Sequence, residues 1–320
     1  MSLTPEIIAL LTLDAIFLFF GVIAFFLSFR LALYWNNDAS TPLQYRLTKQ
    51  SYLVATIIKY IFMLKLPLFA FFIYTCDKLS NIIAGAMCAS GVVNSVDFGL
   101  YLTLFKLFNL YLFGFWVVLH ALDISSETLP FTRLKFILFV VFALPLFVEI
   151  GLEIAFFMSL NISKIVSCCG TLFSASSSSY ISLLFAVDKL LWVGLFYGFF
   201  AMSLLAFWLK NSVLTLFCNA MFLIFAIIAL IVFFSSYIYE LPTHRCPFCL
   251  LQKDYYYVGY LLYTVLFLGT FYGMAGAVVS FIVKEKERCF SKRSLCFNTL
   301  YVVIISLYPI IYFIRNGVWL

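Results

Sequence analysis

Two cysteines three residues apart stand in one of the few polar stretches of the chain, Thr243–Tyr260 (THRCPFCLLQKDYYYVGY). Pro247, between Cys246 and Cys249, suits the first turn of a helix, where its missing N–H costs nothing. The spacing therefore predicts that a helix begins at Cys246 and presents both thiols on one face, with Lys253 one turn beyond. Helix N-terminal N–H groups and a nearby cation favour a thiolate, so the pattern predicts a reactive thiol pair.

The same cysteines allow two other kinds of site. Together with His244 they offer three ligands for zinc or copper, and a fourth ligand would have to come from another loop. They are equally able to form a static disulfide that does no chemistry. A c-type haem site is excluded, because Leu250 follows Cys249 where such a site requires histidine, and no haem is expected.

Composition places this chemistry in a membrane. The chain has 320 residues, 65% of them hydrophobic and 11% charged, which is more apolar surface than a soluble domain of this length hides. The apolar residues form runs of about 20, the length that crosses a bilayer as a helix. We therefore expect an all-α polytopic bundle that forms one integral membrane domain over 1–320. The predicted spans are 7–29, 53–75, 98–120, 136–160, 183–208, 213–238, 258–283 and 295–314, with a tight hairpin at LKNS between the fifth and sixth.

The distribution of basic residues predicts the orientation of the spans. Most loop lysines and arginines fall on one side, and the run KEKERCFSKRS before the last span is the strongest example. Because basic loops stay in the cytoplasm, both termini are predicted to lie outside.

With this orientation, every loop between spans on the outer side carries two cysteines. The pairs are Cys76 with Cys88, Cys168 with Cys169, and Cys246 with Cys249. The outer face of a bacterial inner membrane is oxidising and permits disulfides. By default, we expect Cys76 and Cys88 of the first loop to form a structural disulfide. The alternative is that this pair undergoes thiol–disulfide exchange with the CPFC pair. The adjacent pair of the second loop is expected to bond elsewhere or to remain as thiols.

The sequence Cys246-Pro-Phe-Cys249-Leu-Leu-Gln252-Lys253 resembles the quinone-linked, disulfide-generating membrane proteins of the DsbB type. The resemblance implies a relay in which a periplasmic thioredoxin-like protein gives electrons to a loop pair, the loop pair passes them to the CPFC pair, and quinone accepts them. It also implies that Gln252, Lys253 and Tyr256 lie near the quinone. The tyrosines of the YYY run are equally typical of an interfacial aromatic belt.

Charged residues inside the apolar runs are a second candidate site. Intramembrane charges are costly and usually face the interior of a bundle or a cavity, so a proton or ion route is one interpretation and structural ion pairs are the other. Lys106 is the expected counter-ion of the acids on the fourth span. The residues of the predicted route are Asp14, Lys106, Glu149, Glu153, Asp188 and Lys189.

These patterns favour a thiol–disulfide oxidoreductase of the bacterial inner membrane. The alternatives are a transporter or maturation factor for a soft metal such as copper, and a permease whose outer loops are stapled by disulfides. The lipid bilayer is an expected partner, and no motif typical of nucleic-acid binding is present.

Overall fold

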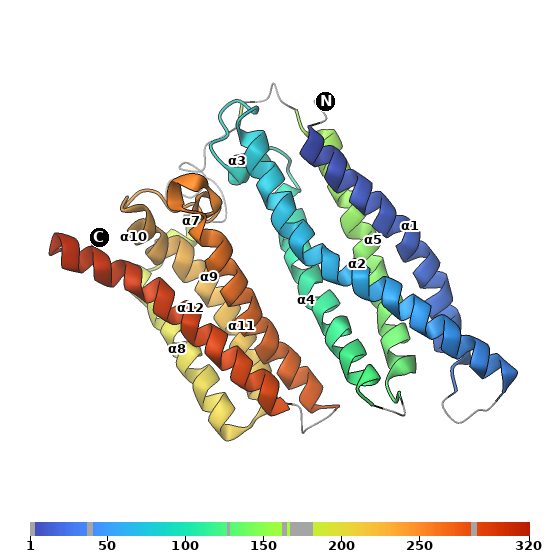
Figure 1. The fold of residues 1–320 in the computed structure, drawn as a ribbon. Coiled ribbons are helices and arrows are strands. Elements are labelled where there is room, and N and C mark those ends of the chain that lie inside the picture. The colour runs from blue at the N-terminus through green and yellow to red at the C-terminus, as the bar shows by residue number, and fades with distance from the viewer. Residues whose placement is uncertain (1–3, 37–40, 127–128, 162–164, 167–181, 283–286) are drawn as a thin grey trace. The chain divides into compact units, whose positions relative to one another are not determined.

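The computed structural model describes residues 4–36, 41–126, 129–161, 165–166, 182–282 and 287–320 (Figure 1). Within these ranges the regular elements are all helices, and eight of them are long and apolar enough to cross a membrane. This confirms the all-α polytopic fold, and the chain is a multi-pass membrane protein. The chain divides into two compact units, residues 1–84 with 92–164 and residues 85–91 with 165–320. The expectation of one integral membrane domain stays a prediction.

The first unit is a bundle of four long helices. Helices α1 and α4 each pack against both α2 and α5, which closes the bundle around an interior. Its core contains a stack of Phe62 on Phe113 at 4.3 Å between ring centroids, with Trp116 edge-on to Phe62. The helices are α1 (Pro5–Tyr34), α2 (Pro42–Ser80), α4 (Gly99–Ile124) and α5 (Thr132–Ser159). The short α3 (Ala89–Val93) precedes α4 in the chain; it begins in the segment 85–91 of the second unit and ends in the first.

The second unit holds the other four spans. Helix α9 continues through a π-helical turn, η1, into α10, so the three form a single span, and α11 packs on both α9 and α12. Two glycines of α11 permit this close packing, because a Cβ at Gly273 would meet the Asn219 side chain at 2.3 Å and one at Gly269 would meet Asn298 at 2.1 Å. The elements are α7 (Ser182–Ala186), α8 (Lys189–Leu209), α9 (Ser212–Ala229), η1 (Leu230–Phe234), α10 (Ser235–Tyr239), α11 (Val258–Ser280) and α12 (Glu287–Asn316).

The ends of two spans test the local predictions. The tight hairpin at LKNS is confirmed: α8 ends at Leu209, Lys210 takes a left-handed conformation with φ 53°, and Asn211 caps α9 by accepting a hydrogen bond from Leu214 N. The fifth span begins later than predicted, because Asp188 is the N-cap of α8 and accepts a hydrogen bond from Leu190 N at 3.0 Å. A short carboxylate at this position satisfies an amide that has no partner within the helix.

Candidate functional site

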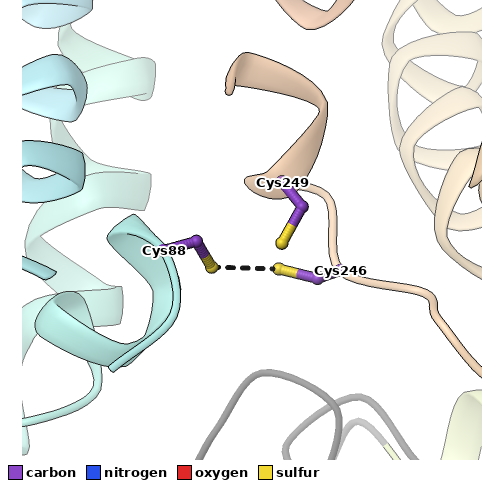
Figure 2. A group of neighbouring side chains, drawn as sticks. All are labelled: Cys88, Cys246 and Cys249. Carbon is purple, nitrogen blue, oxygen red and sulfur yellow. Dashed lines mark hydrogen bonds between the residues drawn. The ribbon is translucent and has the colours of Figure 1, made fainter. Parts of the chain in front are cut away.

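The second unit brings three cysteines from two distant segments together. The sulfurs of Cys88, Cys246 and Cys249 all lie within 4.8 Å of one another, and the Cys88 and Cys246 Sγ atoms are 3.6 Å apart (Figure 2). The three side chains point toward one another in Figure 2 and are 0%, 0% and 3% exposed. The structure holds all three as thiols. We call this group the thiol cluster.

Hydrogen bonds fix the backbone of the CPFC loop against its own unit. The Tyr239 hydroxyl, at the end of α10, donates to the Cys246 carbonyl, and the Tyr263 hydroxyl of α11 donates to the Pro247 carbonyl at 2.6 Å. A Cβ on Gly259 would meet the backbone of Leu250 at 2.9 Å, so the loop rests directly on the first turn of α11. Two helices thereby hold the loop and orient its thiols.

A separate hydrogen bond links the CPFC segment to the segment that carries Cys88. The Gln252 Nε2 amide donates to the carbonyl of Met87, the residue before Cys88, at 3.0 Å. This contact joins the two sides of the thiol cluster outside the sulfurs themselves. The bond holds the Gln252 side chain against the backbone beside Cys88, and its predicted place near a quinone stays a prediction.

The prediction that a helix begins at Cys246 is wrong. Cys246 lies in a loop, Cys249 opens the short 3₁₀ helix η2 (Cys249–Leu251), and α11 begins only at Val258. The backbone at Gln252 is extended, with φ −86° and ψ 159°, and separates η2 from a second 3₁₀ helix, η3 (Lys253–Tyr255). The thiols therefore do not share an α-helical face with Lys253, and the macrodipole of α11 cannot be invoked to activate them.

Lys253 and two of the three tyrosines after the motif, Tyr256 and Tyr257, are exposed. Lys253 lies on the surface, and Tyr256 is 93% exposed with a left-handed φ of 54°. Neither side chain lines the buried thiol cluster. That these two side chains lie near a quinone stays a prediction, and the quinone would then contact the exposed surface of this loop.

In the described part of the chain, Cys76 is not one of the cysteines that gather in the cluster. Cys76 is buried within α2 of the first unit, and the default disulfide between Cys76 and Cys88 is absent because both are thiols. Cys88 lies instead beside Cys246, which is the geometry of the exchange alternative. Cys168 and Cys169 lie outside the described residues.

His244, the third ligand in the predicted metal site, has a different neighbour. Its ring packs edge-on against Tyr239, with 4.4 Å between ring centroids. In the described part of the chain, the group able to hold a metal consists of Cys88, Cys246 and Cys249. Arg245 lies over the Phe185 ring at 4.6 Å, and partial burial lowers the pKa of its guanidinium group.

The first unit contains a continuous network of buried charges. Lys65 Nζ donates to Asp14 Oδ1 at 2.9 Å and to Glu149 Oε1 at 3.1 Å. Lys106 Nζ donates to the same Glu149 oxygen at 3.2 Å and to Glu153. All five side chains are at most 4% exposed. The expectation that Lys106 is the counter-ion of the two glutamates is confirmed.

Sequence reasoning left two members of this network out of the predicted route. Lys65 bridges two of the acids, and Asn109 Nδ2 donates to Glu149 Oε2 at 2.7 Å. Lys65 carried a signal, since it is a lysine inside an apolar run, whereas an asparagine in a span carries a weaker one. Asp188 and Lys189 are exposed at the start of α8 in the other unit, so they do not belong to the network.

A second buried ion pair in the same unit consists of one lysine and one aspartate, so its positive and negative charges balance. Lys135 Nζ donates to Asp123, whose carboxylate also accepts from the Thr132 hydroxyl at 2.7 Å and from Phe131 N at 2.8 Å. These contacts connect the end of α4 to the beginning of α5. Because it is buried but balanced in charge, this pair is a matched control for experiments on the larger network, in which acids outnumber lysines.

Comparison with models of known protein families, with curated proteins and with solved structures finds no match.

Proposed function

We propose that this protein is a membrane thiol–disulfide oxidoreductase whose working group is the thiol cluster. The observation that carries the proposal is the 3.6 Å separation between Cys88 Sγ and Cys246 Sγ, with Cys249 Sγ close to both. Thiol–disulfide exchange needs an attacking sulfur, a central sulfur and a leaving sulfur. Cys88, Cys246 and Cys249 supply these three in that order.

The exchange step balances within the cluster. Starting from a Cys246–Cys249 disulfide, the Cys88 thiolate attacks Cys246 Sγ, the Cys88–Cys246 bond forms, and Cys249 leaves as a thiolate. A disulfide is about 2.05 Å long, so the two sulfurs need to approach by about 1.5 Å. The step moves a disulfide without net oxidation, which is what a relay between a donor and an acceptor requires.

The donor and acceptor are proposed by chemical class. A soluble thioredoxin-like protein with a dithiol gives two electrons to the Cys88–Cys246 disulfide and becomes a disulfide itself, which leaves Cys88, Cys246 and Cys249 as thiols. A quinone in the bilayer then accepts two electrons and two protons, becomes a quinol and restores the Cys246–Cys249 disulfide. We place this chemistry at the outer face of a bacterial inner membrane, and we propose that Lys253 and Tyr256 contact the quinone from the loop surface.

The test is turnover by the purified full-length protein in lipid nanodiscs, with reduced thioredoxin as dithiol and a short-chain ubiquinone as acceptor. We expect quinone-dependent oxidation of the dithiol that is lost in Cys246→Ser and in Cys249→Ser. Cys218, which is buried in α9 outside the cluster, is the matched control, and Cys218→Ser should retain the wild-type rate. Absence of turnover in the wild-type protein, or equal turnover in all variants, would refute the proposal.

The cluster also favours a second candidate, capture of a soft metal ion such as Cu(I). Thiolates bound at about 2.3 Å from one ion lie at most about 4.6 Å apart, close to the spread of these sulfurs, and soft ions select thiolate ligands. The candidate predicts one Cu(I) per chain that blocks alkylation of all three cysteines. It also predicts no dithiol oxidation in the turnover assay, which separates it from the oxidoreductase.

A further inference from the structure

Two buried carboxylate oxygens of the charge network have no hydrogen-bond partner. They are Asp14 Oδ2 and Glu153 Oε1, on side chains that are fully buried. The Asp14 and Glu153 carboxyl groups lie within hydrogen-bonding reach of each other. Ionised carboxylates only accept hydrogen bonds, so two of them cannot satisfy one another. One added proton makes one carboxyl a donor and the other its acceptor.

The charges of the network lead to the same result independently. Three carboxyl groups, from Asp14, Glu149 and Glu153, face two ammonium groups, from Lys65 and Lys106. Full ionisation would leave one uncompensated negative charge inside the membrane-spanning bundle, where such a charge is costly. One bound proton removes this imbalance.

The contacts of the network also show where the proton belongs. Glu149 accepts from both lysines on one oxygen and from Asn109 on the other, so its ionised form is fully satisfied. Among the described residues, Cys76 of α2 also lies close to Glu153 and forms no disulfide. The proton therefore falls to Asp14 and Glu153.

We propose that Asp14 of α1 and Glu153 of α5 form a binding site for one proton, which they share and exchange with water. The O–H of one carboxyl donates to the carboxylate oxygen of the other. A metal cation fits this site poorly, because hard cations such as Mg²⁺ take about six oxygen ligands and two lysine ammonium groups already contact the same carboxyl groups. The inference does not depend on the thiol chemistry.

Infrared spectroscopy of the full-length protein in lipid nanodiscs tests the site. At neutral pH we expect a carboxylic-acid C=O band that shifts in D₂O and on ¹³C labelling of aspartate or glutamate. Asp14→Asn and Glu153→Gln should each lose the band, because two carboxylates then balance two lysines. Lys106→Met should instead gain a second band. The control Asp123→Asn, in the one-to-one pair with Lys135, should leave the band unchanged.

Several results would overturn the proposal. A wild-type spectrum without the band, or a band that shifts with neither label, would show that the pair holds no proton, and this measurement needs no variant to fold. A band retained in both Asp14→Asn and Glu153→Gln would assign the proton elsewhere. A band insensitive to D₂O would show a trapped proton and no exchange, and loss of the band on addition of Na⁺ at constant pH would assign a cation to the site.

Discussion

Replacing Lys106 by methionine should strongly destabilise the first unit. Lys106 is 3% exposed and is the cation that contacts Glu153, whereas Glu149 keeps Lys65 at 3.1 Å and Asn109 at 2.7 Å after the change. The loss therefore falls mainly on Glu153, which loses its cation, so that the network must take up a second proton to avoid a buried, uncompensated charge. Removing one partner of a buried ion pair costs about 3–5 kcal/mol in the free energy of unfolding, which is about a 10²- to 10⁴-fold change in the equilibrium constant.

A double-mutant cycle identifies the cause of that loss. Adding Glu153→Gln to Lys106→Met removes the carboxyl group that has lost its cation, so the double variant should recover most of the lost stability, which gives a coupling energy of about 2–3 kcal/mol. Lys49→Met, at an exposed lysine over the Tyr45 ring, is the surface control and should change the stability by less than about 0.5 kcal/mol.

The assay is reversible unfolding in mixed micelles of dodecyl maltoside and SDS, followed by far-UV circular dichroism. A loss below about 1 kcal/mol for Lys106→Met would show that this charge is not buried as the structure places it. Equal stabilities of the single and double variants would refute the claim that Glu153 depends on Lys106.

Three further predictions concern the second unit. Gln252→Leu should slow oxidant-induced bond formation between Cys88 and the CPFC loop about fivefold, since a hydrogen bond worth about 1 kcal/mol that joins the two segments is lost, and cleavage mapping by mass spectrometry measures this rate. Tyr263→Phe should cost about 1 kcal/mol of stability by removing the hydrogen bond to a partly buried carbonyl, whereas Tyr256→Phe at an exposed site should cost nothing, and the SDS titration compares them. Gly273→Ala should cost about 1–3 kcal/mol by forcing α11 away from α9, while Gly194→Ala, with open space around its Cβ, should be neutral or stabilising by up to about 1 kcal/mol, and a neutral Gly273→Ala would contradict the packing.

Local sequence predicted the spans because membrane insertion depends on local properties. A run of about 20 apolar residues is sufficient to identify a spanning helix, so all eight were found. The LKNS hairpin followed from an equally local signal, an asparagine placed to cap α9 directly after α8. The pairing of Lys106 with Glu149 and Glu153 was accessible because adjacent spans joined by a short loop pack together.

Contacts between distant segments were not accessible in this way. Cys88 and Cys246 are separated by 158 positions, and the sequence allowed exchange between their loops only as an alternative, without indicating which cysteines would meet. Their approach depends on the Gln252 hydrogen bond to Met87 and on the packing of the CPFC loop over Gly259. The same loop contacts explain why the CPFC motif forms a turn and a 3₁₀ helix instead of the predicted α-helical start.

The most direct test of the account is to trap the exchange between Cys88 and Cys246 in cells. In a Cys249→Ser variant no Cys246–Cys249 disulfide can form, and Cys249 cannot displace Cys88 from Cys246. When a thiol oxidant such as diamide is added to the cells and accepts the two electrons, we therefore expect a Cys88–Cys246 disulfide to accumulate. Acid quenching, alkylation and peptide mapping by mass spectrometry would detect it, and adding Cys88→Ser should remove it. If Cys249→Ser cells contain Cys246 only as a thiol, or bonded to a cysteine other than Cys88, the proposed exchange step is wrong.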